Sequence, residues 1–208
     1  MRDTIPIPPG TPRFRGWAVP AAELTLLAER LAKNHPDLAV HGKMVGRYAA
    51  LTARQLGIPR AAEGSLRLAG ELHDVGKLEV PRSILDKPGP LSDHEWARIR
   101  THPVIGADLI RDVGLAQIAE WVIAHHERPD GRGYPRGLDA ADIPLESAVL
   151  SVADAYHAMT TDRPYKAALD PAAALDELGR AAGSQFDPIV VDAFIPSMRH
   201  VLVDTAHL

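Results

Sequence analysis

Apolar residues recur with a helical period along most of the chain. Leu24, Leu27 and Leu31 stand three and four positions apart, which is the spacing of one helix face. Similar patterns, bounded by glycine, proline and a capping box at 92–95, predict further helices at about 37–56, 61–74, 93–101, 103–114, 115–126, 146–159, 171–182 and from 188 onward. Only residues 78–80 have a strand-like pattern, and they are too few for a sheet. We therefore expect an all-α fold of about nine helices.

The same pattern predicts one main domain with a short segment at each end. A length of 208 residues without a linker or a break in composition predicts one domain. Five prolines in residues 1–20 block regular structure, so we expect an extended segment there and an N-terminal helix at 21–34. The main helical domain is expected at 35–200, followed by a C-terminal tail at 201–208. The N-terminal helix either packs on this domain or pairs with a second copy.

The longest segment without a helical pattern is residues 127–144, which contain three glycines and three prolines. An irregular segment of this length inside a helical domain is usually functional. A plain surface loop is the alternative.

Composition narrows the function classes. A net charge of −4 argues against a chain-wide basic surface for duplex nucleic acid, although it leaves room for one basic pocket. The absence of cysteine excludes disulfides, thiolate metal sites and cysteine nucleophiles. Neither a signal-peptide apolar region nor a membrane-spanning run is present, so we expect a soluble, cytoplasmic protein. The 10 histidines are unusually many, and their positions carry the functional argument.

His73 and Asp74 end a predicted helix and follow its apolar face. A buried carboxylate beside a buried imidazole is costly unless a further group compensates, and a cation does so. Lys77 follows at four and three positions, which places it on the same side. The alternative is an ordinary helix end with a polar cap.

His125 and His126 continue the apolar stripe of Ile118, Trp121 and Val122 at the mouth of the 127–144 segment. A single histidine on such a face is usually a packing residue. Two adjacent ones beside a Gly/Pro-rich segment favour metal ligation over packing.

Four further residues extend this set. His41 lies on an apolar face with Asp37 one turn earlier, although Asp37 also suits a helix cap. His102 precedes a proline, which disfavours the α region and predicts a side chain at a break between helices; a polar helix start is the alternative. Asp154 is the one carboxylate of its predicted buried segment, so it needs a metal or a salt bridge to Arg or Lys.

Together these positions predict five histidines and two or three carboxylates facing one interior. Imidazole and carboxylate ligands without sulfur suit Fe, Mn, Zn or Ni, and Mg where carboxylates dominate. This number of ligands is too large for one ion and suits two, an arrangement typical of phosphoester hydrolysis. Arg163 and Lys166 follow Asp154 and are suited to clamp phosphate oxygens, with a plain charged turn as the alternative.

Three motifs resemble the HD-GYP subgroup of the HD superfamily of metal-dependent phosphohydrolases. They are HDVGK at 73–77, HHERPDGRGYP at 125–135 and ADAYHAMTTDRPYK at 153–166, with HPVIGADLI at 102–110 in the same order. The resemblance covers roughly residues 35–200. It implies an all-helical enzyme that hydrolyses cyclic di-GMP to pGpG and/or GMP, through a hydroxide bridging two metals. Iron or manganese is the expected metal, with a third ion as an open alternative.

The resemblance also implies roles for individual residues. One metal would be held by His41, His73, Asp74 and Asp154. The other would be held by Asp74, His102, His125 and His126, with Asp74 bridging the two, and Asp37 stands where trinuclear members carry Glu. Asp74 and Lys77 would be the catalytic groups, Lys77, Tyr134, Arg163 and Lys166 would bind substrate, and the signature loop would comprise Asp130, Gly131, Gly133, Tyr134 and Pro135.

The chain also departs from the family pattern. Met44 stands where many members have Arg, His157 stands where many have Asp, and residues 1–35 contain no sensor domain. Two other interpretations therefore stay open. One is an HD phosphohydrolase for another nucleotide, such as hybrid cyclic GMP-AMP or a nucleoside monophosphate. The other is a module that binds a nucleotide or a partner without turnover. The expected partner is a cyclic dinucleotide substrate, and a homodimer or a separate regulatory protein stays an open alternative.

Overall fold

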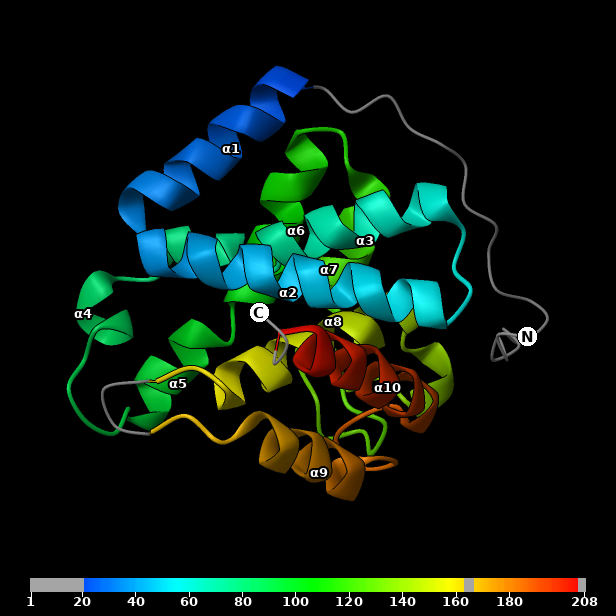
Figure 1. The fold of residues 1–208 in the computed structure, drawn as a ribbon. Helices are drawn as coiled ribbons and strands as arrows, with labels where there is room; N and C mark the ends of the chain where they lie inside the picture. Colours follow the sequence, from blue (N-terminus) through cyan, green and yellow to red (C-terminus); the bar gives the residue numbers. More distant parts are fainter. Residues whose placement is uncertain (1–20, 163–166, 206–208) are drawn as a thin grey trace.

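The fold of the chain is a bundle of helices around one core (Figure 1). The computed structural model describes residues 21–162 and 167–205. The elements in chain order are α1 (Ala21–Asn34), α2 (Pro36–Gln55), α3 (Arg60–Leu72), the 3₁₀ helix η1 (Val75–Glu79), α4 (Arg82–Leu85), α5 (Asp93–Ile99), α6 (His102–Asp112), α7 (Ala116–Ile123), the 3₁₀ helix η2 (Ala140–Asp142), α8 (Leu145–Met159), α9 (Pro171–Ala181) and α10 (Pro188–Thr205).

The expected all-α class is confirmed, with differences in detail. The four-residue helix α4 was not expected, and the segment with a strand-like pattern at 78–80 forms no strand. Leu78 and Glu79 belong to η1, and only Val80 has an extended backbone. Three residues of apolar alternation are too short to distinguish a strand from a turn of 3₁₀ helix.

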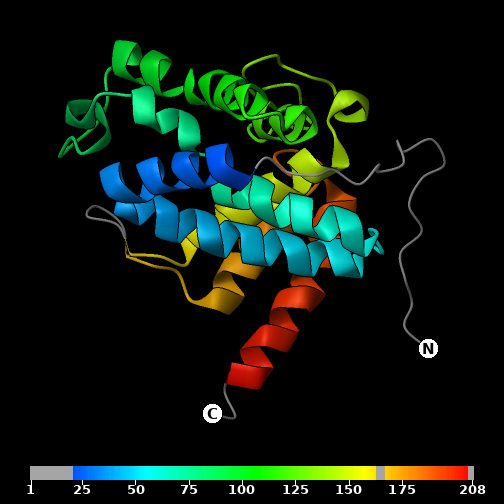
Figure 2. The same cartoon turned by 90° about the horizontal axis from the view of Figure 1, so that it is seen from above.

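α2 and α3 lie side by side (Figures 1 and 2). Their backbones approach through glycines, since a Cβ at Gly42 would lie 2.6 Å from the carbonyl oxygen of Glu71. A Cβ at Gly70 would lie 2.5 Å from Gly46 Cα, and one at Gly46 would meet the carbonyl oxygen of Arg67. This close approach brings the C-terminal end of α3 next to the helix that carries His41.

α8 lies in the centre of the bundle and fixes the other side of the site. Its residues from Ser147 to Leu150, together with Val152 and Ala153, are buried, and it packs against α2, α3, α7, α9 and α10. A helix held on so many sides has little freedom to shift. The later residues of α8 therefore occupy fixed positions relative to α2.

α1 packs on the domain, which was one of the two arrangements expected for the N-terminal helix. Leu27 and Leu31 are buried in the core and Leu24 is partly buried against it. α10 runs to Thr205, past the predicted start of the C-terminal tail at residue 201. The extended segment predicted for residues 1–20 lies outside the described residues. Among the helices of the described part, none has the length and apolar character needed to span a membrane.

Candidate metal centre

The turn after α3 presents His73, Asp74 and Lys77 to the interior. α3 ends at Leu72, two residues before the predicted end, so His73 caps the helix and Asp74 precedes η1. His73 and Asp74 are both buried, and the ammonium of Lys77 donates a hydrogen bond to Asp74 Oδ2 at 2.6 Å. Lys77 and Asp74 therefore share one side, as their spacing predicts.

Asp74 lies between two groups of imidazoles. Its Oδ1 is 3.3 Å from His102 Nε2, and its Oδ2 is 3.4 Å from His73 Nε2. Burial favours a raised pKa for Asp74, but the nearby charges of Lys77 and the surrounding histidines outweigh burial and hold the pKa well below its usual range. The carboxylate therefore stays ionised and offers one oxygen to each group.

The first group joins α2, the turn after α3, and α8. One ligand atom from each of His41, His73 and Asp74 lies within 4.8 Å of the others. Asp154 Oδ1 of α8 lies 2.9 Å from His41 Nε2 and 3.8 Å from His73 Nε2. The alternative prediction, a salt bridge from Asp154 to Arg or Lys, is absent from the described residues. Burial acts to raise the pKa of Asp154, but the hydrogen bond with His41 and the charges of His73 and His41 together outweigh burial, so this pKa is lowered.

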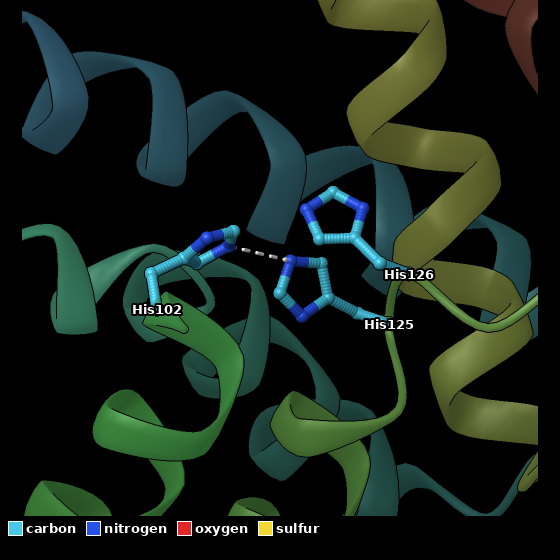
Figure 3. A group of neighbouring side chains, drawn as sticks. All are labelled: His102, His125 and His126. Atoms are coloured by element: carbon cyan, nitrogen blue, oxygen red, sulfur yellow. Dashed lines mark hydrogen bonds between the residues drawn. The ribbon is translucent and has the colours of Figure 1, made fainter. Parts of the chain in front are cut away.

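The second group consists of His102, His125 and His126 (Figure 3). His102 Nε2 and His125 Nε2 point toward each other, 3.5 Å apart, and the ring of His126 lies beside that of His125 with a centroid distance of 4.0 Å. Burial lowers the pKa of His102 and of His126 to about 4. These imidazoles are therefore neutral near pH 7, the state in which histidine binds metals.

Two predictions about the backbone at these histidines are wrong. α7 ends at Ile123, so His125 and His126 lie in the following turn and not on the helix. Burial continues beyond the last helical residue, so the apolar pattern does not reveal where the helix ends. His102 is the first residue of α6 and not a residue outside a helix, so the alternative of a polar helix start is confirmed. A proline in the first turn removes no helical hydrogen bond, so the residue before it can be helical there.

Three of the histidines share one hydrogen-bond pattern. The Nδ1 atom of each lies within hydrogen-bond distance of the carbonyl oxygen three residues earlier: His73 with Gly70, His102 with Ile99 and His125 with Val122. A carbonyl only accepts, so each Nδ1 carries the proton and each Nε2 keeps a lone pair. His73 Nε2 is buried without a hydrogen-bond partner in the described residues. A buried polar atom without a partner needs an explanation, and a cation between these lone pairs and Asp74 provides it.

Other predicted site residues lie elsewhere. Asp37 is exposed in the first turn of α2 and belongs to neither ligand group of the described residues. His35 occupies the N-cap position of α2, so the alternative prediction of a cap role for Asp37 is wrong. Arg163 and Lys166 fall outside the described residues.

The signature loop reaches the second histidine group through Tyr134. The ring of Tyr134 stacks on His126 with a centroid distance of 4.7 Å and an angle of 28°. The guanidinium of Arg100 lies over the ring of Tyr134, 5.5 Å from its centroid. Asp130 accepts hydrogen bonds from the Arg128 side chain and the Arg132 backbone, which lowers the pKa of Asp130 to about 2.

Glycine and one buried carboxylate shape this loop. Gly131 has φ +70°, and a Cβ at Gly133 would collide with the backbone of Glu127 and Arg128. Glu127 is 2% exposed and accepts hydrogen bonds from the backbone N–H groups of Arg136 at 2.7 Å and Leu138 at 3.0 Å. Sequence analysis missed Glu127. Its signal was an acidic residue that directly follows a buried histidine pair, where backbone donors of an irregular loop need an acceptor.

Sequence comparisons identify relatives of this chain. A family model described as HD domain matches residues 25–190. A cyclic di-GMP phosphodiesterase of Pseudomonas aeruginosa is 39% identical over 181 residues, 86% of this chain and 43% of that protein. The cyclic di-GMP phosphodiesterase response regulator RpfG of Xanthomonas campestris is 41% identical over 175 residues, 83% of this chain and 46% of that protein. A 3'3'-cGAMP-specific phosphodiesterase of Vibrio cholerae is 38% identical over 166 residues, 79% of this chain and 36% of that protein.

Solved structures share the fold. An HDG"Y"P protein from Bdellovibrio bacteriovorus matches with a TM-score of 0.63 at 23% identity, over 78% of this chain and 52% of that one. The L. monocytogenes PgpH HD domain in complex with cyclic-di-AMP matches with a TM-score of 0.58 at 16% identity, over 85% and 96%. This chain spans less than half the length of the curated relatives named above. With the family model matching most of its length and the HD motif at the centre of its buried site, the chain belongs to the HD domain family.

Proposed function

We propose that this chain is a metal-dependent phosphodiesterase that hydrolyses cyclic di-GMP to pGpG and/or GMP. The observation that carries the proposal is Asp74, whose two carboxylate oxygens face two separate groups of buried imidazoles. Such an arrangement suits two adjacent divalent ions, the common arrangement for phosphoester hydrolysis. The named activity of the relatives from P. aeruginosa and X. campestris supports the substrate class.

The imidazole and carboxylate donors of the site fit a pair of divalent metal ions. We assign one ion to His41, His73, Asp74 and Asp154, and the other to Asp74, His102, His125 and His126. Nitrogen and oxygen donors without sulfur suit iron or manganese, and Zn, Ni and Mg accept related donor sets. When bound, the ions supply an acidified water and stabilise charge on the phosphoryl oxygens.

The remaining residues of the site would bind and orient the substrate. The ammonium of Lys77 reaches into the centre beside Asp74, where it would stabilise charge on the leaving 3′-oxygen. Tyr134 borders the second histidine group from the loop side, where it would contact the nucleotide. Arg163 and Lys166 would hold the phosphates, a role that rests on the sequence alone.

The proposal is tested with Asp74→Asn, which keeps the shape of the side chain and removes its charge. We expect this variant to lose both metal ions and all turnover, because an amide oxygen is a weak bridging ligand. Metal content is measured by elemental analysis after anaerobic purification, and products of cyclic di-GMP are separated by chromatography. Asp112→Asn, at an exposed position at the end of α6, is the matched control and should behave as wild type. Full metal content and turnover in Asp74→Asn would overturn the proposal.

A second candidate substrate has support of its own. The similarity to a 3'3'-cGAMP-specific phosphodiesterase favours the hybrid cyclic dinucleotide as an alternative. The same metal-loaded preparation, offered cyclic di-GMP and 3'3'-cGAMP at equal concentration, decides between them by the ratio of kcat/KM values.

A further inference from the structure

His41 differs from His73, His102 and His125 in how its second ring nitrogen is held. The Nδ1 atoms of His73, His102 and His125 contact backbone carbonyls. The Nδ1 of His41 instead lies 2.7 Å from Nδ1 of His157, and the two rings have a centroid distance of 4.8 Å. The partner of this ligand is therefore a side chain from another helix, and sequence analysis gave that side chain no role.

The positions of the protons follow from this contact. Two ring nitrogens at this distance share one hydrogen, so one donates and the other accepts. If His41 offers its Nε2 lone pair to a cation beside Asp154, then Nδ1 of His41 must carry the proton and donate it. His157 accepts through Nδ1, carries its own proton on Nε2, and can donate to Thr161 Oγ1 at 3.3 Å.

α8 consequently holds His41 from both sides. Asp154 contacts Nε2 of His41, and His157, one turn further along the same helix, contacts Nδ1. The side chain of His41 is only 14% exposed, so water has little room to replace His157 as an acceptor. α8 is anchored in the core, so both contacts come from a rigid element.

We propose that His157 is a positioning residue for the metal centre: it accepts the hydrogen bond from His41 and fixes the ring orientation and tautomer in which His41 binds metal. This inference rests on the proposed metal centre and adds a residue that does not itself bind the ion. Outer hydrogen-bond partners of this kind usually change metal affinity about 10- to 100-fold.

The test measures Mn²⁺ binding by the EPR signal of the free ion, at fixed pH and without substrate. We expect His157→Ala and His157→Leu, which accept no hydrogen bond, to bind one of the two ions about 10- to 100-fold more weakly. His157→Asp, whose carboxylate accepts the same hydrogen bond, should retain wild-type affinity. His94→Ala removes an exposed histidine from α5 and should match wild type. Circular dichroism of each metal-free variant establishes that it is folded, and the leucine variant fills the space if the alanine variant does not fold.

The outcomes distinguish the role of His157 from the existence of the metal centre. If wild type binds two Mn²⁺ ions and both non-accepting variants bind them equally well, the role of His157 is wrong and the metal centre stands. The same holds if His157→Asp binds as weakly as His157→Ala, because a purely structural role gives no rescue by an acceptor. If wild type binds no Mn²⁺, iron or other divalent metal, both the centre and the role of His157 are wrong.

Discussion

Lys77 combines a charged contact with a position inside the candidate centre. Its ammonium lies 2.6 Å from Asp74 Oδ2, and its side chain is 21% exposed, so it is partly shielded from water. A cation in such a place can neutralise charge that develops on a phosphodiester as its bond breaks, and shielding strengthens this effect. Its effect on catalysis is therefore expected to exceed its effect on metal binding.

Lys77→Met tests this separation, because it keeps the length of the side chain and removes the charge. We expect kcat for cyclic di-GMP to fall by about 10²- to 10³-fold with both metal ions retained. Steady-state kinetics and elemental analysis on one preparation give both quantities. Lys43→Met, exposed on α2, is the control and should leave both unchanged. Loss of metal in parallel with activity would instead make Lys77 a residue of the metal site.

Spacing along the chain predicts contacts within one turn, but not contacts between distant segments. The Lys77–Asp74 contact follows from a separation of three residues. The contact between His41 and His157 spans 116 positions and depends on how α8 packs on α2. Glu127 was missed for the same reason, since its value as an acceptor exists only once the loop folds around it.

At the scale of elements, the packing of α2 on α3 depends on glycines, which have no side chain. Gly46 and Gly70 face each other so closely that a Cβ on either would meet backbone atoms. Gly64 of α3, by contrast, is exposed and has nothing within 4 Å of its Cβ position. Replacement of glycine by alanine should therefore change the free energy of unfolding in opposite directions at these two kinds of position.

We expect Gly46→Ala to lower the free energy of unfolding by about 1–3 kcal/mol, since the two helices must separate. Metal affinity should fall with it, because His41 moves away from the end of α3. Gly64→Ala should raise the free energy of unfolding by about 0.5–1 kcal/mol, through helix propensity. Urea denaturation of the metal-free proteins measures both. Equal stability of the two variants would contradict the close packing described for α2 and α3.

Helix identity was predictable from apolar periodicity, whereas helix ends were not. The Ser92–Glu95 capping box was recognisable because its hydrogen bonds are local, and Glu95 Oε2 indeed accepts from Ser92 N at 2.7 Å. The predicted ends of α3 and α7 were too late, because inward-facing histidine side chains follow both helices and continue the pattern of buried positions. The sequence shows that these residues are buried, but not that they have left the helix.

For the whole molecule, the buried imidazoles link stability to pH. Burial lowers the pKa of His102 and His126 to about 4 in the folded chain, against 6.5 in the unfolded chain. Between these values the unfolded state binds more protons than the folded state, so stability falls as pH falls from about 6.5 to about 4. Asp74 and Asp154, with lowered pKa values, add a further loss below about pH 4.

We therefore expect the metal-free protein to lose about 2–4 kcal/mol of unfolding free energy between pH 7 and pH 5. Urea denaturation after chelation with EDTA measures this change. His102→Gln, which removes one of the buried titrating imidazoles, should have a shallower dependence on pH. A flat profile in the metal-free wild type would show that these imidazoles take up protons in the folded state.

The candidate ligands come from α2, the turn after α3, α6, the turn after α7, and α8, segments spread over most of the described chain. Ions held by all of them would act as cross-links that tie the bundle together without any cysteine. Unfolding would then have to wait until an ion leaves, so the lifetime of the folded molecule would depend on metal supply. In a metal-poor cell, the metal-free protein would unfold more often, and proteases would degrade the unfolded molecules.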